Sequence, residues 1–464
     1  MNSHFYQFKG PRLPAFISAL VLAGCANVSQ DRGIDDIARL MSERVQINPA
    51  FSEQDVYKFD HRSAQVDNLL KQPLTAESAA QLALLNSPGF KANLAELGIA
   101  EAELVDAKHL PNPLFSFGHV TGGGAIEIDR SLLVDVMALL TLSQRGTIES
   151  SHYRQVQLTT AGMAMRLIAV TMESYYRAVA ARQMENVAER GWSAASASSQ
   201  LAKQMAAVGN WSKLDQAREQ AFFAEANQNL IRARRDSAIT KERLARNLGM
   251  SGPEFDTVSF PDRLPELPAK VVDLLDAEQQ ALNLRLDLLT ARERSAETAA
   301  ALGLTKATRF VNVLEIGPAS KGVTGLPTEH GYQIALELPL FDWGNAKVAR
   351  AESIYMASVH RTADVALRVR SEVRESYVTY RAAYESASDY RDEIVPLKKK
   401  ISDEVLLRYN GMLASSFELL ADARDQLSSV NQAIDAQLQY WIADVKFDAA
   451  VKGAGNQQIN GAQQ

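Results

Sequence analysis

The sequence predicts a mainly α-helical fold with a small β part, in which one structural plan is used twice. Apolar residues recur at alternating spacings of three and four over long stretches, which indicates coiled-coil helices. Short stretches of period two precede them and indicate strands. Motifs recur after about 200 residues, which indicates a duplication rather than short repeats. With 46% hydrophobic and 22% charged residues, the 464-residue chain has the composition of a folded protein.

The N-terminal residues predict an export signal. Lys9 and Arg12 form a positive region, and an apolar stretch over 14–22 follows that is too short for an ordinary spanning helix. The stretch ends in Leu22-Ala23-Gly24-Cys25, which resembles the lipobox of bacterial lipoproteins. We therefore expect residues 1–24 to be a signal peptide and Cys25 to carry a covalent lipid such as palmitate. The residue after the cysteine is not aspartate, which favours the outer membrane. A secretory signal with an unmodified cysteine is the alternative.

Several classes of function lack a signal. The net charge is −6 and no long run of basic residues is present, so nucleic acid is not an expected partner. The seven histidines include no pair at metal-ligand spacing. Gly122-Gly123-Gly124 lacks the lysine and hydroxyl residue of a phosphate-binding loop, and no nucleophile elbow is present. We expect no enzyme, no metal site and no cofactor other than the lipid on Cys25.

The first half predicts two strands followed by a helical hairpin. Candidate strands over about 112–141 flank the Gly122–Gly124 turn. Helical patterning starts near Ser150, breaks at Gly209-Asn210, and returns to end near Leu248-Gly249. The hairpin is expected over about 146–249.

The second half repeats this order. Strands are expected within about 308–340, because Tyr332, Ile334, Leu336 and Leu338 alternate with less apolar residues. A heptad seam then follows Gly344, a break is expected at Tyr409-Asn410-Gly411, and a second seam returns from it. This hairpin is expected over about 344–450. The seams contain the following positions: Val359, Ala363, Ala366, Arg370, Val373, Tyr377, Tyr380, Tyr384, Ala387, Arg391 and Ile394, then Phe417, Leu420, Arg424, Leu427, Asn431, Ile434, Leu438, Trp441 and Val445.

Matching motifs place the two halves in register. Gly146 pairs with Gly344 at an offset of 198 residues, and the segments that begin at Ala217 and Ala423 pair at an offset of 206. A proline-rich stretch joins the halves. The expected organisation is a signal peptide (1–24), an N-terminal periplasmic segment (25–72), a first repeat (73–252), a linker (253–270), a second repeat (271–452) and a flexible tail (453–464).

The strand count predicts an assembly. No apolar segment beyond the signal reaches the 18 or so residues of a spanning helix, so a chain that crosses a membrane would use its strands. Four strands cannot close a barrel, which needs about eight. Three copies would supply twelve strands, enough for a water-filled pore.

Taken together, these features resemble the TolC-like outer-membrane factors over nearly all of the chain. The most specific pieces are Phe341-Asp342-Trp343-Gly344 and the segment Arg408-Tyr409-Asn410-Gly411 that leads into Phe417-Glu418-Leu419-Leu420. Leu284-Arg285-Leu286-Asp287-Leu288 is similar to the family's Arg-Pro-Asp segment, but Leu286 stands where the family has proline. Asn86-Ser87-Pro88, its counterpart in the first half, keeps the proline.

The resemblance implies a fold, an assembly and partners. A homotrimer would form a 12-stranded transmembrane β-barrel in the bacterial outer membrane, with four strands from each protomer, and an α-helical tunnel of coiled-coil hairpins in the periplasm. The protein would be anchored by lipid in the outer membrane. Its protein partners would be a periplasmic adaptor and an inner-membrane pump, often of the resistance-nodulation-division type. It would conduct drugs or metal ions passively in tripartite efflux.

The resemblance also places the functional residues at the helical tips. Gly209 and Gly411 would form the tip turns, and carboxylates on the return helices just beyond them would form rings that favour cations. These candidate pore residues are Asp215, Glu219, Glu418, Asp422 and Asp425. A solvated helix face is the alternative for all five.

Two other functions remain open at this point. A lipid-anchored periplasmic coiled-coil scaffold or adaptor would explain the heptads and Cys25, but not the strand pairs that precede each long helix. A channel for type I protein secretion would share every feature of the efflux channel, because the tunnel is alike in both.

Overall fold

The computed structural model describes residues 27–45, 47, 56–57, 64–256, 258–271 and 273–453, and it confirms the mainly helical fold with a small β part. The predicted signal peptide, Cys25 and residues 454–464 of the predicted tail lie outside the described residues. The chain divides into two compact units. The sheet unit combines the residues up to 33 with 96–157 and 290–363, and the hairpin unit combines 34–95, 158–289 and the residues from 364 onward.

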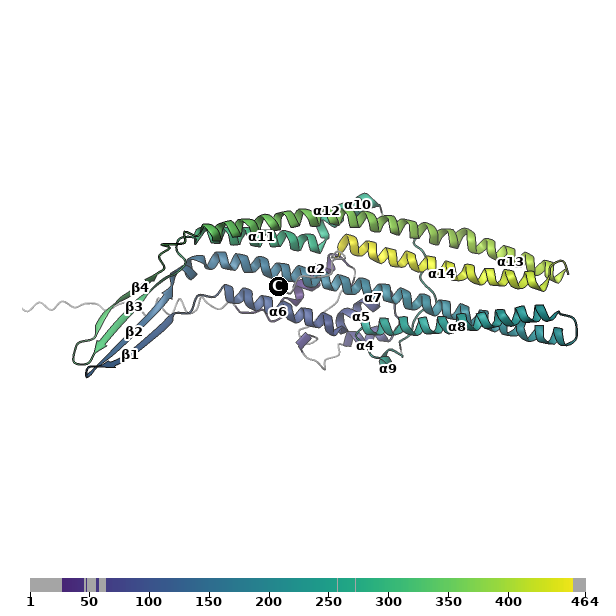
Figure 1. Cartoon of the computed structure of the whole chain (residues 1–464), viewed down its shortest axis with the longest axis horizontal. Helices are drawn as coiled ribbons and strands as arrows, with labels where there is room; N and C mark the ends of the chain where they lie inside the picture. The colour runs from purple at the N-terminus through teal and green to yellow at the C-terminus, as the bar shows by residue number, and fades with distance from the viewer. Residues whose placement is uncertain are drawn as a thin grey trace, which may run out of the picture. The chain divides into compact units, whose positions relative to one another are not determined.

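One antiparallel sheet dominates the sheet unit (Figure 1). Its order is β1 (Leu114–Gly122), β2 (Ala125–Asp135), β3 (Leu314–Val323) and β4 (Glu329–Leu336). The turn between β1 and β2 uses Gly123 and Gly124, whose φ angles of 61° and 83° lie in the left-handed region. The strand pairs of the two halves meet at β2 and β3, so β1 and β4 are the edges of the sheet.

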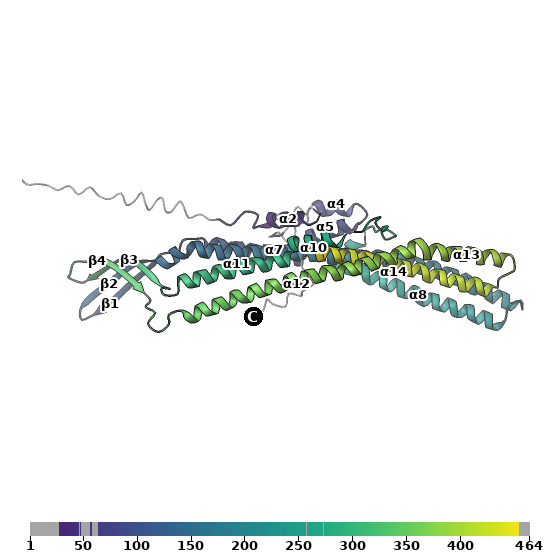
Figure 2. The ribbon, with the colours of Figure 1, turned by 90° about the horizontal axis from the view of Figure 1, so that it is seen from above.

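A helix precedes and a helix follows each pair of strands along the chain. In the first half α6 (Pro88–Ala107) precedes β1 and α7 (Val136–Ala207) follows β2. In the second half α11 (Leu286–Ala307) precedes β3 and α12 (Asn345–Asp389) follows β4. Two of them, α11 and α12, are the neighbours of β3 and β4 along the chain (Figure 2).

The strand expected to reach Thr141 ends earlier than predicted. The Asp135 carboxylate accepts a hydrogen bond of 2.9 Å from the Ala138 N–H, so it caps α7, which begins at Val136. Gly146 therefore lies inside α7 rather than at its entry. Gly344 does precede α12, with a φ of 74°, and an added Cβ would approach the Arg309 carbonyl oxygen to 2.7 Å. The two glycines that match in the sequence thus have different local structures.

Two helical hairpins form much of the hairpin unit. The first joins α7 to α8 (Lys213–Asn247), and the second joins α13 (Val395–Asn410) to α14 (Ser416–Lys452), which lie side by side in Figure 2. The predicted heptad positions that are buried here include Val373, Tyr380, Ala387, Ile434, Leu438 and Val445. Other seam positions are exposed in the single chain, among them Ala363, Arg370, Arg391, Phe417 and Asn431, so burial confirms the predicted seams only in part.

The second long helix is interrupted where the heptad pattern showed no break. Residues Tyr390–Ile394 form one π-helical turn between α12 and α13. Pro396 follows it and explains it, because proline has no N–H to donate and its ring clashes with the carbonyl four residues before it. The wider turn satisfies the backbone instead, since the Val395 N–H bonds the Tyr390 carbonyl five residues back.

Short helices complete the hairpin unit and supply much of its core. They are α2 (Ile34–Ser42), α4 (Ala64–Leu70), α5 (Ala76–Asn86), α9 (Gly252–Phe255) and α10 (Leu274–Leu284). One cluster of buried side chains joins α5 to α7, α8 and α14, and a second joins α10 to α12 and α14. Stacked rings lie within these clusters, among them Tyr176 on Trp441 and Tyr380 on Phe447.

The proline-rich linker is held by side chains of the helices. After α9, its described residues form no further helix or strand before α10. The Pro265 carbonyl accepts from Gln437 Nε2 at 2.7 Å and from Trp441 Nε1 at 3.0 Å, and the Pro268 carbonyl accepts from the Tyr384 hydroxyl at 3.1 Å. These side-chain donors replace the backbone donors that an irregular segment lacks.

Both halves anchor the end of their return helix in the same way. Asn86 is the last residue of α5, Arg285 is the first residue after α10, and each side chain donates to backbone carbonyls at the end of a return helix. Asn86 Nδ2 donates to the Leu248 and Gly249 carbonyls after α8, at 3.0 and 2.9 Å. Arg285 Nη1 donates to the Ala450 carbonyl in α14 at 3.1 Å. This shared contact supports the predicted duplication.

Candidate functional site

The sheet has one apolar face and one polar face. The strand registers place the odd-numbered residues of β1 beside the even-numbered residues of β2, β3 and β4. This face is largely aromatic and aliphatic, and most of its large apolar side chains are exposed to solvent in the single chain. It contains Phe115, Phe117, Ile126, Ile128, Leu132, Ile316, Tyr332, Ile334 and Leu336.

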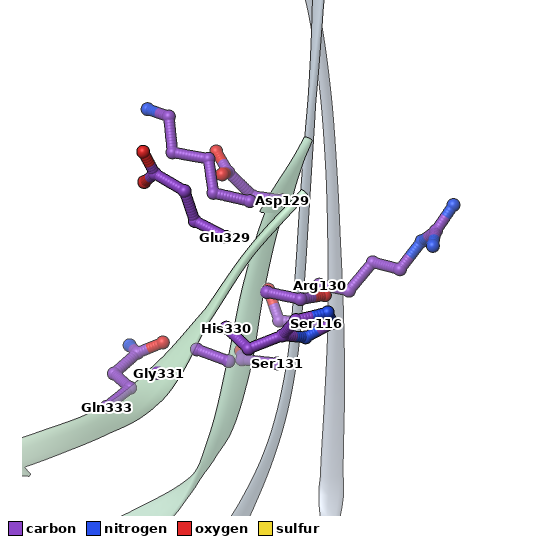
Figure 3. Close-up of a pocket in the computed structure, with 11 residues that line it drawn as sticks. Ser116, Asp129, Arg130, Ser131, Glu329, His330, Gly331 and Gln333 are labelled. Carbon is purple, nitrogen blue, oxygen red and sulfur yellow. The ribbon is translucent and has the colours of Figure 1, made fainter. Parts of the chain in front are cut away.

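The opposite face holds hydroxyls, an amide and charged groups. Asp129, Glu329 and Gln333 project from one side of the sheet, whereas Arg130 projects from the other (Figure 3). A cavity of about 420 Å³ lies along this polar region and is also lined by Ser116. Glu127, Asp129, Glu315 and Glu329 share the face with a single described lysine, Lys321, which forms an ion pair with Glu127. The polar face therefore carries a net negative charge.

Of the two strand histidines, His330 lines this cavity together with Arg130, whereas His119 does not. His119 pairs with Ile128, and His330 pairs with Ser320, so the register puts both on the apolar side with Arg130. Within the described part of the chain, no three His, Cys, Asp or Glu side chains are grouped so that they could hold a metal ion.

The first tip, residues 208–212, turns where the sequence predicted. Gly209 has a φ of 80°, and an added Cβ would meet no atom within 4 Å. The Ser212 side chain then caps α8 by accepting from the Asp215 N–H at 3.1 Å. Asp215 is half-buried, accepts from the Ser212 hydroxyl at 2.6 Å, and lies 3.7 Å from Arg218. At this tip, Asp215 thus takes part in the hydrogen bonds with Ser212 that cap the start of α8.

The second tip, residues 411–415, differs from the prediction in its backbone. Gly411 has a φ of −81°, so it does not use the freedom of glycine. The left-handed residue is Met412, with a φ of 61° and a side chain that is 94% exposed. Ser415 and Glu418 then form a capping box at the start of α14, with hydrogen bonds of 3.1 and 3.2 Å. The Asn-Gly dipeptide indicated the turn but not which residue would be strained.

The five predicted carboxylates do not form one exposed row. Glu219 is only 4% exposed and accepts a 2.7 Å hydrogen bond from the Ser198 hydroxyl of α7, so it lies inside its own hairpin. Asp422 is half-buried, and its Oδ2 has no hydrogen-bond partner among the described residues. Asp425 is exposed and lies 3.6 Å from Lys398 of α13. Glu219 is therefore covered by α7 in the single chain, because a spacing of four residues does not show which side the neighbouring helix covers. The pore role of the five carboxylates stays a prediction.

Two cation–π contacts connect the hairpins near the tips, and sequence reasoning missed both. The guanidinium of Arg218 lies 5.3 Å from the ring centroid of Phe417, and that of Arg424 lies 4.1 Å from the ring centroid of Phe222. Arg424 occupies a core position of the predicted seam. That position was the only feature of the sequence to indicate that the Arg424 side chain contacts another helix. Val208, Leu214, Met412 and Leu413 leave apolar side chains exposed at the tips.

Ser29, near the start of the described residues, is held on α6. The backbone N–H of Ser29 donates to Glu101 at 2.9 Å, and Glu101 is buried. Among the described residues, no helix combines the length and apolar character needed to cross a membrane.

Comparison with protein-family models finds no match, and comparison with the curated proteins finds none. Solved structures share the fold. The chain is similar to the outer-membrane channel OprN, with a TM-score of 0.69 and 16% identity over 86% of this chain and 94% of that one. It is also similar to the outer membrane protein VceC from Vibrio cholerae (TM-score 0.68, 15% identity, 84% of this chain and 97% of that one) and to the Campylobacter jejuni CmeC outer membrane channel (0.67, 15%, 84% and 86%). The chain therefore shares the fold of these solved outer-membrane proteins, which agrees with the fold that the resemblance implied.

Proposed function

We propose that this chain is the outer-membrane channel subunit of a tripartite efflux system, which conducts small solutes passively and has no catalytic chemistry. The single observation that carries the proposal is that the sheet has one apolar face and one polar face. Its apolar face suits lipid, and its acidic, hydroxylated face suits a water-filled pore. The fold shared with OprN, VceC and CmeC supports the same conclusion.

The sheet requires other copies of the chain. Strands β1 and β4 are both edges, and an edge inside a membrane would leave unpaired backbone groups in hydrocarbon. In our proposal β4 of one copy pairs with β1 of the next, and three copies close a 12-stranded barrel. The chain is then a homotrimer, with each polar face turned to the lumen.

The helical tips are the proposed contact for other proteins. The exposed Val208, Leu214, Met412 and Leu413 offer apolar surface at both tips, and we assign this surface to a periplasmic adaptor. An inner-membrane pump, of the resistance-nodulation-division type in our proposal, would supply energy and choose the solute. An adaptor that binds an open arrangement of the tips better than a closed one would shift the channel toward conduction.

Acylation of Cys25 completes the proposal as the lipid anchor in the outer membrane. The contact between Ser29 and Glu101 supports it, because it holds the chain just after Cys25 on α6, the helix that precedes β1. A Cys25→Ser variant is expected to lose incorporated palmitate while it keeps the trimer.

Planar-bilayer recording of the purified full chain tests the function, with the mass of the complex measured on the same sample. We expect a trimer and discrete conductance steps. A lipid-anchored scaffold would give no steps, and that outcome would overturn the channel. Deletion of the gene followed by drug and metal sensitivity assays separates efflux from protein secretion, since a secretion channel would leave solute sensitivity unchanged.

A further inference from the structure

A basic cavity lies between α11 and α12, next to the ends of β3 and β4. Its volume is about 430 Å³. Near the end of α11 and the start of α12, the cavity is lined by polar and basic side chains: Arg309, Asn312, Lys347 and Arg350. Small and aliphatic side chains line the remainder, among them Ala301, Leu302, Ala351 and Ile354. The two helices that enclose the cavity lie side by side in both views of the chain (Figures 1 and 2).

Among the residues that the structure describes, no carboxylate pairs with the positive charges of this cavity. Within the described part of the chain, neither Arg309, Lys347 nor Arg350 forms an ion pair, whereas the nearby Lys306 pairs with Glu352 at 2.8 Å. Three unpaired cations around one cavity create a positive potential that attracts an anion.

Arg309 is fixed in place but incompletely satisfied. Its Nη2 donates to Asn345 Oδ1 at 2.9 Å, and its guanidinium lies 4.4 Å from the ring centroid of Phe310. Its Nε is buried without a hydrogen-bond partner among the described residues. An unsatisfied buried donor is costly unless a ligand or water supplies the acceptor. The pre-positioned guanidinium is therefore suited to an oxyanion.

Exposed aromatic side chains lie next to the basic residues along the chain. Phe310 and Trp343 contact each other edge to face, with ring centroids 6.5 Å apart, and are 47% and 61% exposed. Phe341, between β4 and α12, is 98% exposed. Aromatic residues of this kind gather where a membrane meets water. A free inorganic anion has no apolar part that could pack against these aromatic side chains.

We propose that the cavity binds the phosphodiester of an anionic glycerophospholipid. Arg309, Lys347 and Arg350 contact the phosphate, and the acyl chains lie along Phe310, Phe341 and Trp343. The inference rests on the proposed function, which places the strands in the outer membrane and these helices at its periplasmic surface. Basic pockets at a membrane surface hold anionic headgroups through the same combination of charge and apolar contact.

Native mass spectrometry of the detergent-solubilised full chain tests the site. The probes are dihexanoyl phosphatidylglycerol, dihexanoyl phosphatidylcholine and inorganic phosphate. The variant is Lys347→Gln/Arg350→Gln, because both side chains are exposed and their loss spares the contacts of Arg309. The matched control is Arg294→Gln/Arg361→Gln, which removes the same charge from exposed positions of the same two helices.

We expect the wild type and the control to bind phosphatidylglycerol about tenfold more tightly than phosphatidylcholine, and the Lys347→Gln/Arg350→Gln variant to lose that preference. Equal affinity for the two lipids in the wild type, an unchanged preference in the variant, or an equal loss in the control would each overturn the site. Competition by inorganic phosphate at equal concentration would overturn the lipid as its ligand. Bilayer recordings of the same samples separate the two proposals: conductance without a lipid preference sinks only this inference, whereas no conductance sinks the proposed function.

Discussion

At the scale of single residues, a buried acid gives the protein a pH dependence. Burial raises the pKa of the Asp444 carboxyl to about 6, the negative charge of Asp448 raises it as well, and Lys452 opposes the shift. The folded chain therefore binds this proton more tightly than the unfolded chain, whose carboxyl has a pKa near 3.8. The contribution of Asp444 to the free energy of unfolding is therefore fully present below pH 3.8, and it is lost as the pH rises through about 6.

The Asp444→Asn substitution should remove this loss. At pH 8 the free energy of unfolding should rise by at most about 3 kcal/mol relative to the wild type, and below pH 4 the two should converge. Guanidinium unfolding at both pH values, followed by circular dichroism, measures the difference. Asp435→Asn, at an exposed position of α14, is the control and should change little at either pH. A variant with no advantage at pH 8 would show that Asp444 is ordinarily hydrated.

Arg285 is the second residue with a predicted energetic role. Its side chain is fully buried, and it bonds Asp287 at 3.0 Å, the Ala450 carbonyl at 3.1 Å and the Glu372 carboxylate. Removing it would leave two poorly hydrated carboxylates, so Arg285→Ala should lower the free energy of unfolding by about 3 kcal/mol. Thermal or chemical unfolding measures this loss.

The control for Arg285 is Arg235→Ala. Arg235 also pairs with a carboxylate, Asp236, at 2.7 Å, but both side chains are more than half exposed, so its loss should have little effect. Equal losses for the two variants would argue against burial as the cause. The resemblance noted in the sequence drew attention to the segment around Arg285, but the contact with α14 could be seen only in the structure.

At the scale of elements, the two tips make opposite use of their turn residues. Gly209 is in the left-handed region, so Gly209→Ala should destabilise the first tip by about 1 kcal/mol. Met412 is in the same region at the second tip, so Met412→Gly should relieve strain by a similar amount, partly offset by the entropy of glycine. Hydrogen exchange at the residues that flank each turn measures the local effect.

Gly411→Ala is the control for the tips. Gly411 has an ordinary φ of −81°, and the nearest atom to an added Cβ lies 3.5 Å away, so the substitution should be tolerated. If Gly411→Ala loosened its tip as much as Gly209→Ala did, the assignment of the strained residue to Met412 would be wrong.

Elements with long-range periodicity could be predicted, whereas those set by one local contact could not. The long helices could be predicted because a heptad repeat is recognised from many residues together. Both breaks between helices could be predicted from the Gly and Asn residues at the tips. The end of β2 depended on the Asp135 cap, and the π turn depended on Pro396, which the heptad count passed over. The burial of Glu219 could not be predicted either, since it depends on where α7 lies against α8.

At the scale of the whole molecule, the acidic face of the sheet predicts the ion preference of the proposed trimer. Glu127, Asp129, Glu315 and Glu329 outnumber Lys321 on that face, and threefold symmetry would repeat the excess around the lumen. Rings of carboxylates favour cations. The wild-type channel should therefore show a reversal potential of cation-selective sign under a KCl gradient.

Asp129→Asn/Glu329→Gln should move that reversal potential toward zero, because two carboxylates leave each copy while Lys321 remains. The shift should be largest at low salt, since exposed charges are screened over about 10 Å at 0.1 M. Asp403→Asn/Glu404→Gln removes the same charge from exposed positions of α13, outside the sheet, and should move the potential less. A reversal potential that responds to the α13 pair but not to the strand pair would place ion selection in the helices and argue that the acidic face of the sheet does not line the pore.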